Sequence, residues 1–237
     1  QELTGLFVGP ITQRPAIGAQ ATFVADMQSL PLFQRDFPVR TIERTEFGRA
    51  DEDVVGLPIT QCWGTSLKIP LRLIDSNPVT APVDNGPQGT WTYLAYERIR
   101  EGHSPGWPFD VAPPEIRNVY RNGRLVPADE YVTSSEDMTY PKYATVVFLH
   151  APESGDVLCY DSDQNDDTYR NPAMLAHGLL SAYGKQPCDA ASFAVAAEAL
   201  VGAYPDGTYP WLDFAVSETR QFGDVLNYLL FRLRLGR

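Results

Sequence analysis

The sequence has only three cysteines and three histidines in 237 residues, and it has no apolar run of the roughly 18 residues needed to cross a membrane. Cys62, Cys159 and Cys188 lie far apart without a C-x-x-C pair, which argues against a disulfide-rich secreted module. Residues 1–9 also lack the basic and apolar regions of a signal peptide. We therefore expect the chain to fold in a reducing cytosol.

Signatures of catalysis and of nucleotide binding are absent from the sequence. It contains no G-x-S-x-G elbow, no H-x-x-x-H pair and no glycine-rich phosphate loop. His103, His150 and His177 stand alone, as histidines in structural positions usually do. The sequence therefore predicts no catalytic residue, no metal or organic cofactor and no enzyme activity.

Positive charge is scarce, with 19 Lys and Arg against 30 Asp and Glu, a net charge of −11. Binding to nucleic acid needs clustered positive charge. The only basic run is Arg232, Arg234 and Arg237 near the end of a predicted helix, where cations suit the negative end of the helix dipole. We expect neither nucleic acid nor a membrane as a partner.

Proline is abundant, at 20 residues, and gathers in residues 77–89 and 104–114. Because proline cannot donate to a β-ladder and restricts the residue before it, both stretches are predicted to be extended connectors. The resulting fold class is α+β: a small antiparallel β-module with flanking helices and extended proline-rich connectors. The predicted parts are 1–76 (N-terminal arm and mixed segment), 77–114 (connectors with one bridging element), 115–162 (β-module) and 163–237 (helical segment).

The first part begins with an apolar arm over residues 1–18, too rich in proline and glycine for a helix. Its large apolar side chains must be buried somewhere. The arm can fold back on its own domain or cross to a neighbouring copy, and its proline and glycine content favours the neighbouring copy. Residues 19–30 have the apolar spacing of a short helix. The ten charged residues of 35–53 predict a solvated face. The apolar residues of the arm are Leu3, Leu6, Phe7, Val8, Ile11 and Ile17.

Two further segments before the β-module resemble strands. Residues 59–75 alternate apolar and polar positions, and Pro70 restricts them to the edge of a sheet. Residues 90–100 begin as an aromatic, strand-like run, whereas their second half suits either a strand or a helix.

The β-module is predicted around the dipeptide Asn122-Gly123, a strong signal for a type I′ hairpin turn. Further short strands are expected at 131–134, 144–149 and 157–160. Residues 172–183 predict a helix with Pro172 in its first turn.

Two more helices are expected towards the C-terminus. Asp189 is predicted to cap a helix over 190–203, and Ser217 is predicted to cap a last helix that ends at Leu235. The broad apolar stripe of this last helix indicates a core position. It comprises Phe222, Val225, Leu226, Leu229, Leu230 and Leu233.

The acidic run from Asp161 to Asp167 begins like an EF-hand calcium loop. The sixth position is Asp166 instead of glycine, and the twelfth is Pro172 instead of glutamate, so an EF-hand is excluded. The run predicts a solvated turn. A weak calcium site of another kind stays open, with Asp161, Asp163 and Asn165 as its ligands.

The segment Val119–Tyr160 has an ordered set of short motifs: a strand into Asn122-Gly123, Asp129 and Tyr131, an apolar strand, Ala151-Pro152, a Gly155-Asp156 turn and a final strand. In this order it resembles a module of tail fibre and baseplate proteins of tailed bacteriophages. The resemblance implies a non-enzymatic structural protein of the virion tail, assembled in the host cytoplasm. Its implied partners are other copies of itself and neighbouring virion proteins.

Two alternatives remain open from the sequence. A carbohydrate-binding or receptor-binding module would use the aromatic residues Trp107, Phe109 and Trp211 to stack on a host-surface glycan. A polysaccharide or cell-wall hydrolase would use two carboxylates from distant positions, which leave no spacing signature.

Overall fold

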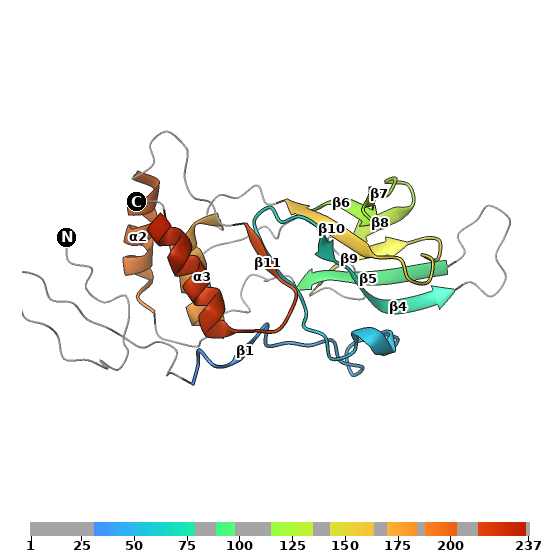
Figure 1. The fold of residues 1–237 in the computed structure, drawn as a ribbon, viewed down its shortest axis with the longest axis horizontal. Helices are drawn as coiled ribbons and strands as arrows, with labels where there is room; N and C mark the ends of the chain where they lie inside the picture. The colour runs from blue at the N-terminus through green and yellow to red at the C-terminus, as the bar shows by residue number, and fades with distance from the viewer. Residues whose placement is uncertain are drawn as a thin grey trace, which may run out of the picture.

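The computed structural model describes residues 31–78, 89–97, 115–134, 143–163, 170–183, 188–202 and 213–235. Within these ranges the strands form two four-stranded antiparallel sheets and two two-stranded sheets, and three helices stand to one side of them (Figure 1). This architecture confirms the predicted α+β class.

The strands and helices have the following bounds. The strands are β1 (Asp36–Phe37), β2 (Gln61–Trp63), β3 (Ile69–Pro70), β4 (Arg72–Pro78), β5 (Gly89–Glu97), β6 (Glu115–Arg121), β7 (Arg124–Leu125), β8 (Tyr131–Ser134), β9 (Tyr143–Phe148), β10 (Leu158–Asp163), β11 (Phe214–Val216) and β12 (Arg220–Gln221). The helices are the 3-10 turn η1 (Glu52–Val54), α1 (Pro172–Gly178), its π-helical continuation η3 (Leu179–Tyr183), α2 (Ala190–Gly202) and α3 (Phe222–Leu235).

The two larger sheets form a sandwich. The first sheet has the order β3-β10-β6-β7, and the second has the order β4-β5-β9-β8. Side chains of both sheets meet in one buried cluster that includes Val119 and Tyr160 from the first sheet and Val146 and Phe148 from the second. The chain joins the sheets at both sides, through Leu71 between β3 and β4 and through residues 126–130 between β7 and β8.

The predicted strands of the β-module are present, but they belong to both sheets. Strands β6, β7 and β10 lie in the first sheet, whereas β8 and β9 lie in the second. Each sheet also includes strands from before residue 115, so the sandwich crosses the predicted boundaries at 76 and 114. Pro70 lies in an edge strand, as predicted. Strand β5 continues to Glu97, so the helical alternative is wrong as far as that residue.

The hairpin at Asn122-Gly123 is confirmed. Both residues have positive φ, 52° and 78°, as a type I′ turn requires. The Asn122 side chain also ties this turn to the next one, because its amide donates to Asp156 Oδ1 at 2.6 Å and its oxygen accepts from the Val157 amide at 2.9 Å. One side chain therefore fixes both turns at this end of the first sheet.

The charged segment before β2 covers a sheet as well as facing solvent. Ile42 and Phe47 are fully buried against Ile74, Leu94 and Tyr143 of the second sheet. The prediction of a solvated face therefore describes the charged side chains only, since apolar residues between them supply the opposite face.

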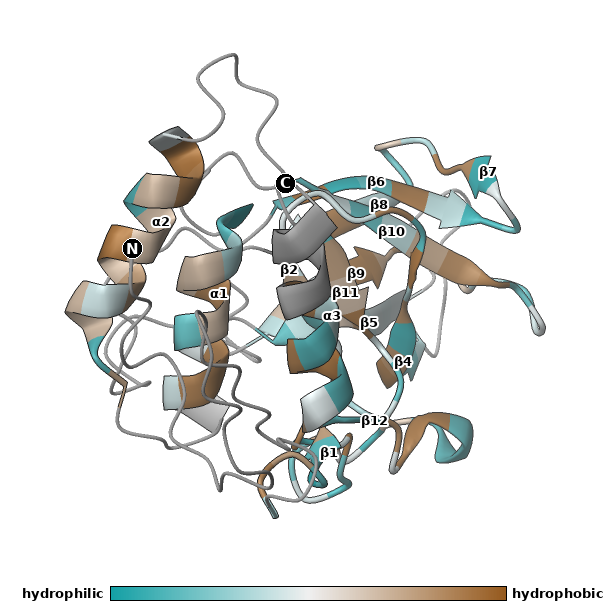
Figure 2. Ribbon diagram, turned by 60° about the vertical axis from the view of Figure 1, so that its left-hand side comes forward, coloured by the Kyte–Doolittle hydropathy of each residue, from teal (hydrophilic) through white to brown (hydrophobic). Residues whose placement is uncertain are grey.

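The helical group has α1 at its centre, between α2 and α3 (Figure 2). The Asn171 side chain caps α1 by accepting from the Ala173 amide at 3.0 Å, and Pro172 opens the helix as predicted. Asp189 is confirmed as the cap of α2, where it accepts from the Ala191 amide at 3.2 Å. Within the described ranges no helix is long and apolar enough to span a membrane.

The predicted start of the last helix at Ser217 is wrong. Strand β12 pairs with β1 at Arg220 and Gln221, and this pairing holds the backbone extended until α3 begins at Phe222. The first amides of α3 donate to main-chain carbonyls instead of a capping side chain, Phe222 to Arg35 at 2.8 Å and Gly223 to Phe33 at 2.9 Å.

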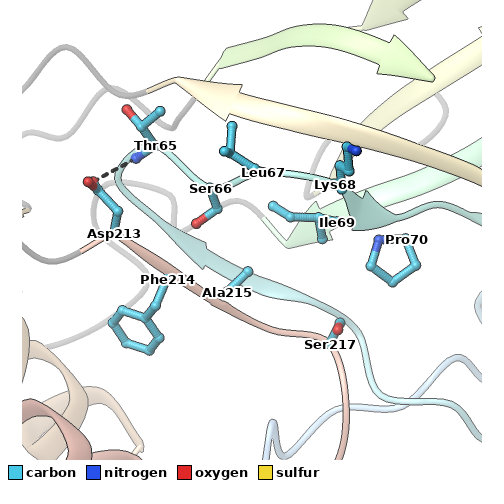
Figure 3. A pocket seen from close by; sticks show the side chains of 10 residues that line it. All are labelled: Thr65, Ser66, Leu67, Lys68, Ile69, Pro70, Asp213, Phe214, Ala215 and Ser217. Carbon is cyan, nitrogen blue, oxygen red and sulfur yellow. Dashed lines mark hydrogen bonds between the residues drawn. The ribbon is translucent and has the colours of Figure 1, made fainter. Parts of the chain in front are cut away.

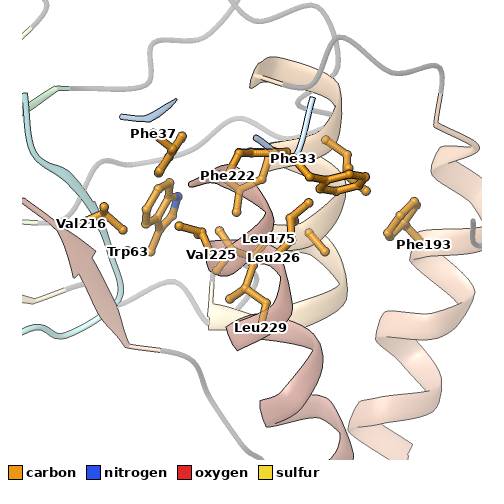
Figure 4. Close-up of a cluster of buried hydrophobic side chains, with 13 residues drawn as sticks. Phe33, Phe37, Trp63, Leu175, Phe193, Val216, Phe222, Val225, Leu226 and Leu229 are labelled. Atoms are coloured by element: carbon orange, nitrogen blue, oxygen red, sulfur yellow. The ribbon is translucent and has the colours of Figure 1, made fainter. Parts of the chain in front are cut away.

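The apolar stripe of α3 is a core element, as predicted. Phe222, Val225, Leu226 and Leu229 are buried against α1 and against an aromatic group of the N-terminal segment (Figure 4). That group comprises Phe33, Phe37 and Trp63. The side chains of Leu230 and Leu233 lie outside the described part, as do the arm at 1–18, the predicted helix at 19–30 and most of both proline-rich connectors.

The positive φ of Gly123 predicts a cost for any side chain at this position. Replacing Gly123 with Val should lower the free energy of unfolding by about 1–2 kcal/mol, since a Cβ in the left-handed region is strained although the space around it is open. Gly123→Asn should recover most of the loss, because asparagine tolerates this conformation. Urea denaturation measures both changes; a Gly123→Val variant as stable as the parent would contradict the type I′ assignment.

His177 predicts a pH dependence of stability. It is 3% exposed, its Nδ1 has no hydrogen-bond partner, and its ring lies 5.0 Å from that of Phe193. Burial lowers the pKa of His177 below its ordinary value of 6.5. Below about pH 6.5 His177 binds a proton in the unfolded chain but not yet in the folded chain, so the free energy of unfolding falls as the pH falls. The slope for this one group is at most about 1.4 kcal/mol per pH unit.

Denaturation at pH 7.5 and 5.5 tests this dependence. His177→Leu should reduce the loss of stability between the two pH values, whereas His150→Leu, at an exposed position, should leave it unchanged. An identical pH dependence of the parent and His177→Leu would refute the assignment.

Candidate interaction site

The structure describes two of the residues that the sequence singled out for binding. Asp161 and Asp163 lie on β10 of the first sheet, whereas Asn165, Trp107, Phe109 and Trp211 lie outside the described residues. The solvated-turn prediction is wrong for 161–163, because these residues continue the strand.

Protein donors occupy the carboxylates of Asp161 and Asp163. The buried Asp161 accepts from the Lys68 amide at 2.8 Å and from the Tyr120 hydroxyl at 2.6 Å, and the second bond raises the pKa of Tyr120. Asp163 accepts from the Thr65 hydroxyl at 3.1 Å and lies 3.5 Å from Arg117. In the described part of the chain no three His, Cys, Asp or Glu side chains are grouped as a metal site needs.

The outer face of the first sheet has an uncharged row that crosses all four strands. The strand register places Pro70 opposite Cys159, Cys159 opposite Tyr120, and Tyr120 opposite Leu125. Their neighbours along each strand point into the sandwich core, and side chains alternate between the two faces of a strand. These four side chains therefore lie on the face away from the sandwich core, and we call them the outer row; Cys159 within it is buried, at 8% exposed.

Exposed aliphatic side chains extend this apolar surface. Leu125 is 61% exposed, and Val157, two residues before Cys159 and hydrogen-bonded to Asn122, is 66% exposed. The solvent face of an antiparallel sheet normally carries polar residues, and contiguous apolar surface marks a site of interaction. The outer face of the first sheet thus has the composition of an interface.

An open groove borders the outer row at Pro70. It has a volume of about 430 Å³ and is lined by Thr65 to Pro70 on one side and by Asp213, Phe214, Ala215 and Ser217 on the other (Figure 3). Leu67, at 73% exposed, is the most exposed large apolar side chain of the described residues. Apart from Leu67, the groove is lined mainly by polar atoms.

Polar contacts fix the two walls of the groove. Asp213 accepts from the Thr65 amide at 2.9 Å and forms a two-point ion pair with Arg170, also at 2.9 Å. On the other wall Lys68 has a positive φ of 54°, which is unfavourable for a residue with a Cβ. The bond from its amide to Asp161 holds this conformation, so the groove has a defined shape before anything binds.

Another group of charged residues deserves comparison with a hydrolase site. Arg40 makes ion pairs with both Glu46 and Glu97. Tyr143 donates to Glu46 at 2.7 Å and Gln61 donates to Glu97 at 2.8 Å, while burial raises the pKa of Tyr143. Each carboxylate is shared between the guanidinium and a second donor. This arrangement joins the segment before β2 to the second sheet, which is a structural role.

Cys62, in the strand before residues 65–70, is an unreactive thiol. Cys62 donates from Sγ to Ser162 Oγ over 3.1 Å inside the protein, and burial raises its pKa to about 11. Such a thiol stays protonated at neutral pH and is a poor nucleophile.

The comparisons with known proteins give no relative: no protein-family model matches the chain, and neither does any curated protein or any solved structure.

Sequence reasoning missed the outer row and the groove. A usable signal was present, because Leu125-Val126 and the run Val157–Tyr160 place apolar residues at consecutive positions. Such runs are typical of strands that are buried on both faces. The contribution of residues 65–70 and 213–217 to one groove had no sequence signal, since it depends on contacts between distant segments.

The Arg40 network predicts a difference between two arginines. Arg40→Ala should lower the free energy of unfolding by about 1–3 kcal/mol, because it leaves two partly buried carboxylates without their cation. Arg44→Ala should cost about 0.5 kcal/mol or less, since its partner Glu52 is 83% exposed. Chemical denaturation of both variants measures the difference; equal losses would show that the network adds nothing beyond a surface ion pair.

Proposed function

We propose that the chain is a non-enzymatic structural protein that assembles with copies of itself through the outer face of the first sheet. The observation that carries the proposal is the outer row, which places the partly exposed Pro70 and Tyr120 and the exposed Leu125 on one face of the sheet, with the buried Cys159 between Pro70 and Tyr120. Covering the exposed Leu125 and Val157 removes apolar area from water and favours association.

The charges around the outer row favour a second copy as the partner. The chain as a whole carries −11, so most of its surface repels another copy. On the same sheet, however, the basic Arg117 pairs with the acidic Asp163 at 3.5 Å, and the exposed Lys68 lies next to β3. A surface that carries both signs repels a second copy less than the acidic remainder does.

The resemblance of Val119–Tyr160 to a module of phage tail fibre and baseplate proteins supplies the proposed setting. We infer that the assembly is part of a tailed-phage virion, at the baseplate, the tail tip or a fibre attachment, and that neighbouring virion proteins are its other partners. This part of the proposal rests on the resemblance alone, whereas the association surface rests on the geometry of the first sheet.

Substitutions on the outer face test the association. The parent chain should show a concentration-dependent mass above that of the monomer in sedimentation velocity. The double variant Leu125→Asp/Val157→Asp should sediment as a monomer at concentrations where the parent associates, since two buried charges on each copy oppose the contact.

Val195→Asp is the matched control for this experiment. Val195 is also 66% exposed but lies on α2, away from the sandwich, so its substitution should leave association unchanged. Thermal melts confirm that the variants are folded. A parent chain that remains a monomer at every accessible concentration would overturn the proposal.

A further inference from the structure

We propose that Asn122 is a deamidation site that the folded chain keeps closed, and that its conversion to aspartate or isoaspartate permanently releases the two turns that its side chain joins. The chemistry concerns a single chain, so the inference goes beyond the proposed self-assembly and does not depend on it. The observations that carry it are the dipeptide Asn122-Gly123 and the two hydrogen bonds that hold the Asn122 side chain.

An asparagine that is followed by glycine is prone to an intramolecular reaction. The main-chain nitrogen of Gly123 attacks Cγ of Asn122, so that a bond forms between these two atoms and the bond from Cγ to Nδ2 breaks. The side-chain nitrogen leaves as ammonia and takes the proton that the Gly123 nitrogen gives up. Water then opens the cyclic imide to aspartate or isoaspartate. Glycine presents the least hindered nitrogen because it has no Cβ, and both residues are exposed, so water reaches them.

The folded chain holds the Asn122 side chain by both of its polar atoms. The leaving nitrogen Nδ2 donates to Asp156 Oδ1 at 2.6 Å, and Oδ1 of Asn122 accepts from the Val157 amide at 2.9 Å. The main-chain amide of Asn122 also donates to the Val157 carbonyl at 2.9 Å. Ring closure requires the side chain to turn towards the Gly123 nitrogen and to give up both side-chain bonds. The site therefore reacts only from the population of chains in which the two turns have separated.

Asp156 is itself fixed in place, which makes it a firm partner for Asn122. Its side chain is 7% exposed, accepts from the Glu153 amide at 2.9 Å and lies 3.5 Å from Nε of Arg121. Arg121 belongs to the first sheet, and its guanidinium lies over the ring of Phe148 in the second. The carboxylate that closes the site is thus anchored to both sheets of the sandwich.

Conversion reverses the interaction between the two side chains. An aspartate at position 122 has an oxygen in place of Nδ2, so two carboxylate oxygens meet where a donor and an acceptor were 2.6 Å apart. Ionised carboxylates only accept hydrogen bonds, and like charges that share a site repel each other. Isoaspartate in addition places an extra carbon in the main chain of the turn. Because the released ammonia does not add back, a chain that has reacted cannot restore the original contact.

Peptide mapping by mass spectrometry gives the first test, with the parent chain incubated at mildly alkaline pH either folded or in urea. Conversion at Asn122 should be slower in the folded chain by about tenfold or more, since it proceeds only from the opened population. The second Asn-Gly dipeptide, Asn85-Gly86, lies outside the described residues and is the reference in urea, where both sites should react at similar rates. Conversion of Asn122 as fast in the folded chain as in urea would overturn the inference. So would an Asn122 that stays intact in urea while Asn85 reacts.

Two variants show whether Asp156 keeps the site closed. Asp156→Ala removes the acceptor of Nδ2 and should raise the rate of conversion at Asn122 in the folded chain several-fold. Glu130→Ala removes another partner of Arg121, 3.5 Å from it, and should leave the rate unchanged. Melting curves confirm that both variants are folded at the temperature of incubation. An unchanged rate in folded Asp156→Ala would contradict the role given to this carboxylate.

A variant of the product tests the consequence of the reaction. Asn122→Asp should lower the urea midpoint of unfolding, whereas Asn77→Asp, at an exposed position of β4, should change it little. Adding Asp156→Asn to Asn122→Asp exchanges the donor and the acceptor of the contact and should recover most of the lost midpoint. The inference is wrong if Asn122→Asp is as stable as the parent, or if the double variant is no more stable than Asn122→Asp alone.

Discussion

The pairing of β10 with the segment that follows β2 is the contact on which the rest of the structure depends. Ser162 accepts from the Ser66 amide at 3.0 Å and donates to the Gly64 carbonyl at 3.1 Å, while Asp161 accepts from the Lys68 amide. These bonds join residues almost 100 positions apart inside the protein. Buried polar groups that lose a partner cost about 1–3 kcal/mol each, so this region tolerates few alternative arrangements.

Three parts of the molecule meet at this contact. Before it, β2 pairs with β11 and its Trp63 stacks on Phe37 beside α3; after it, β3 and β4 enter the two sheets of the sandwich. The stacked rings of Trp63 and Phe214, 4.8 Å apart, continue from the sandwich side towards Tyr228 of α3. The short segment from Gln61 to Pro78 therefore connects the helical group with the sandwich.

The groove and the outer row follow from the same arrangement. The left-handed turn at Lys68 directs β3 along the margin of the first sheet, and Asp213 holds β11 beside it. The two walls of the groove are thereby held in place beside the outer row. The polar residues of this region are engaged in holding backbone.

The sequence by itself determined several local elements: the type I′ turn, because only a few residue types accept positive φ; the Asp189 cap of α2 and the proline that opens α1; the edge position of Pro70; and the core stripe of α3. It did not assign the strands to their two sheets, because the alternation of apolar residues along a strand is the same whichever strand it pairs with. Tertiary contacts alone decided that β12 delays α3, since Arg220 and Gln221 pair with β1. They also decided that Asp161 is a buried acceptor and not a solvated acid, because its donors come from Lys68 and Tyr120, whose proximity depends on the register of three strands.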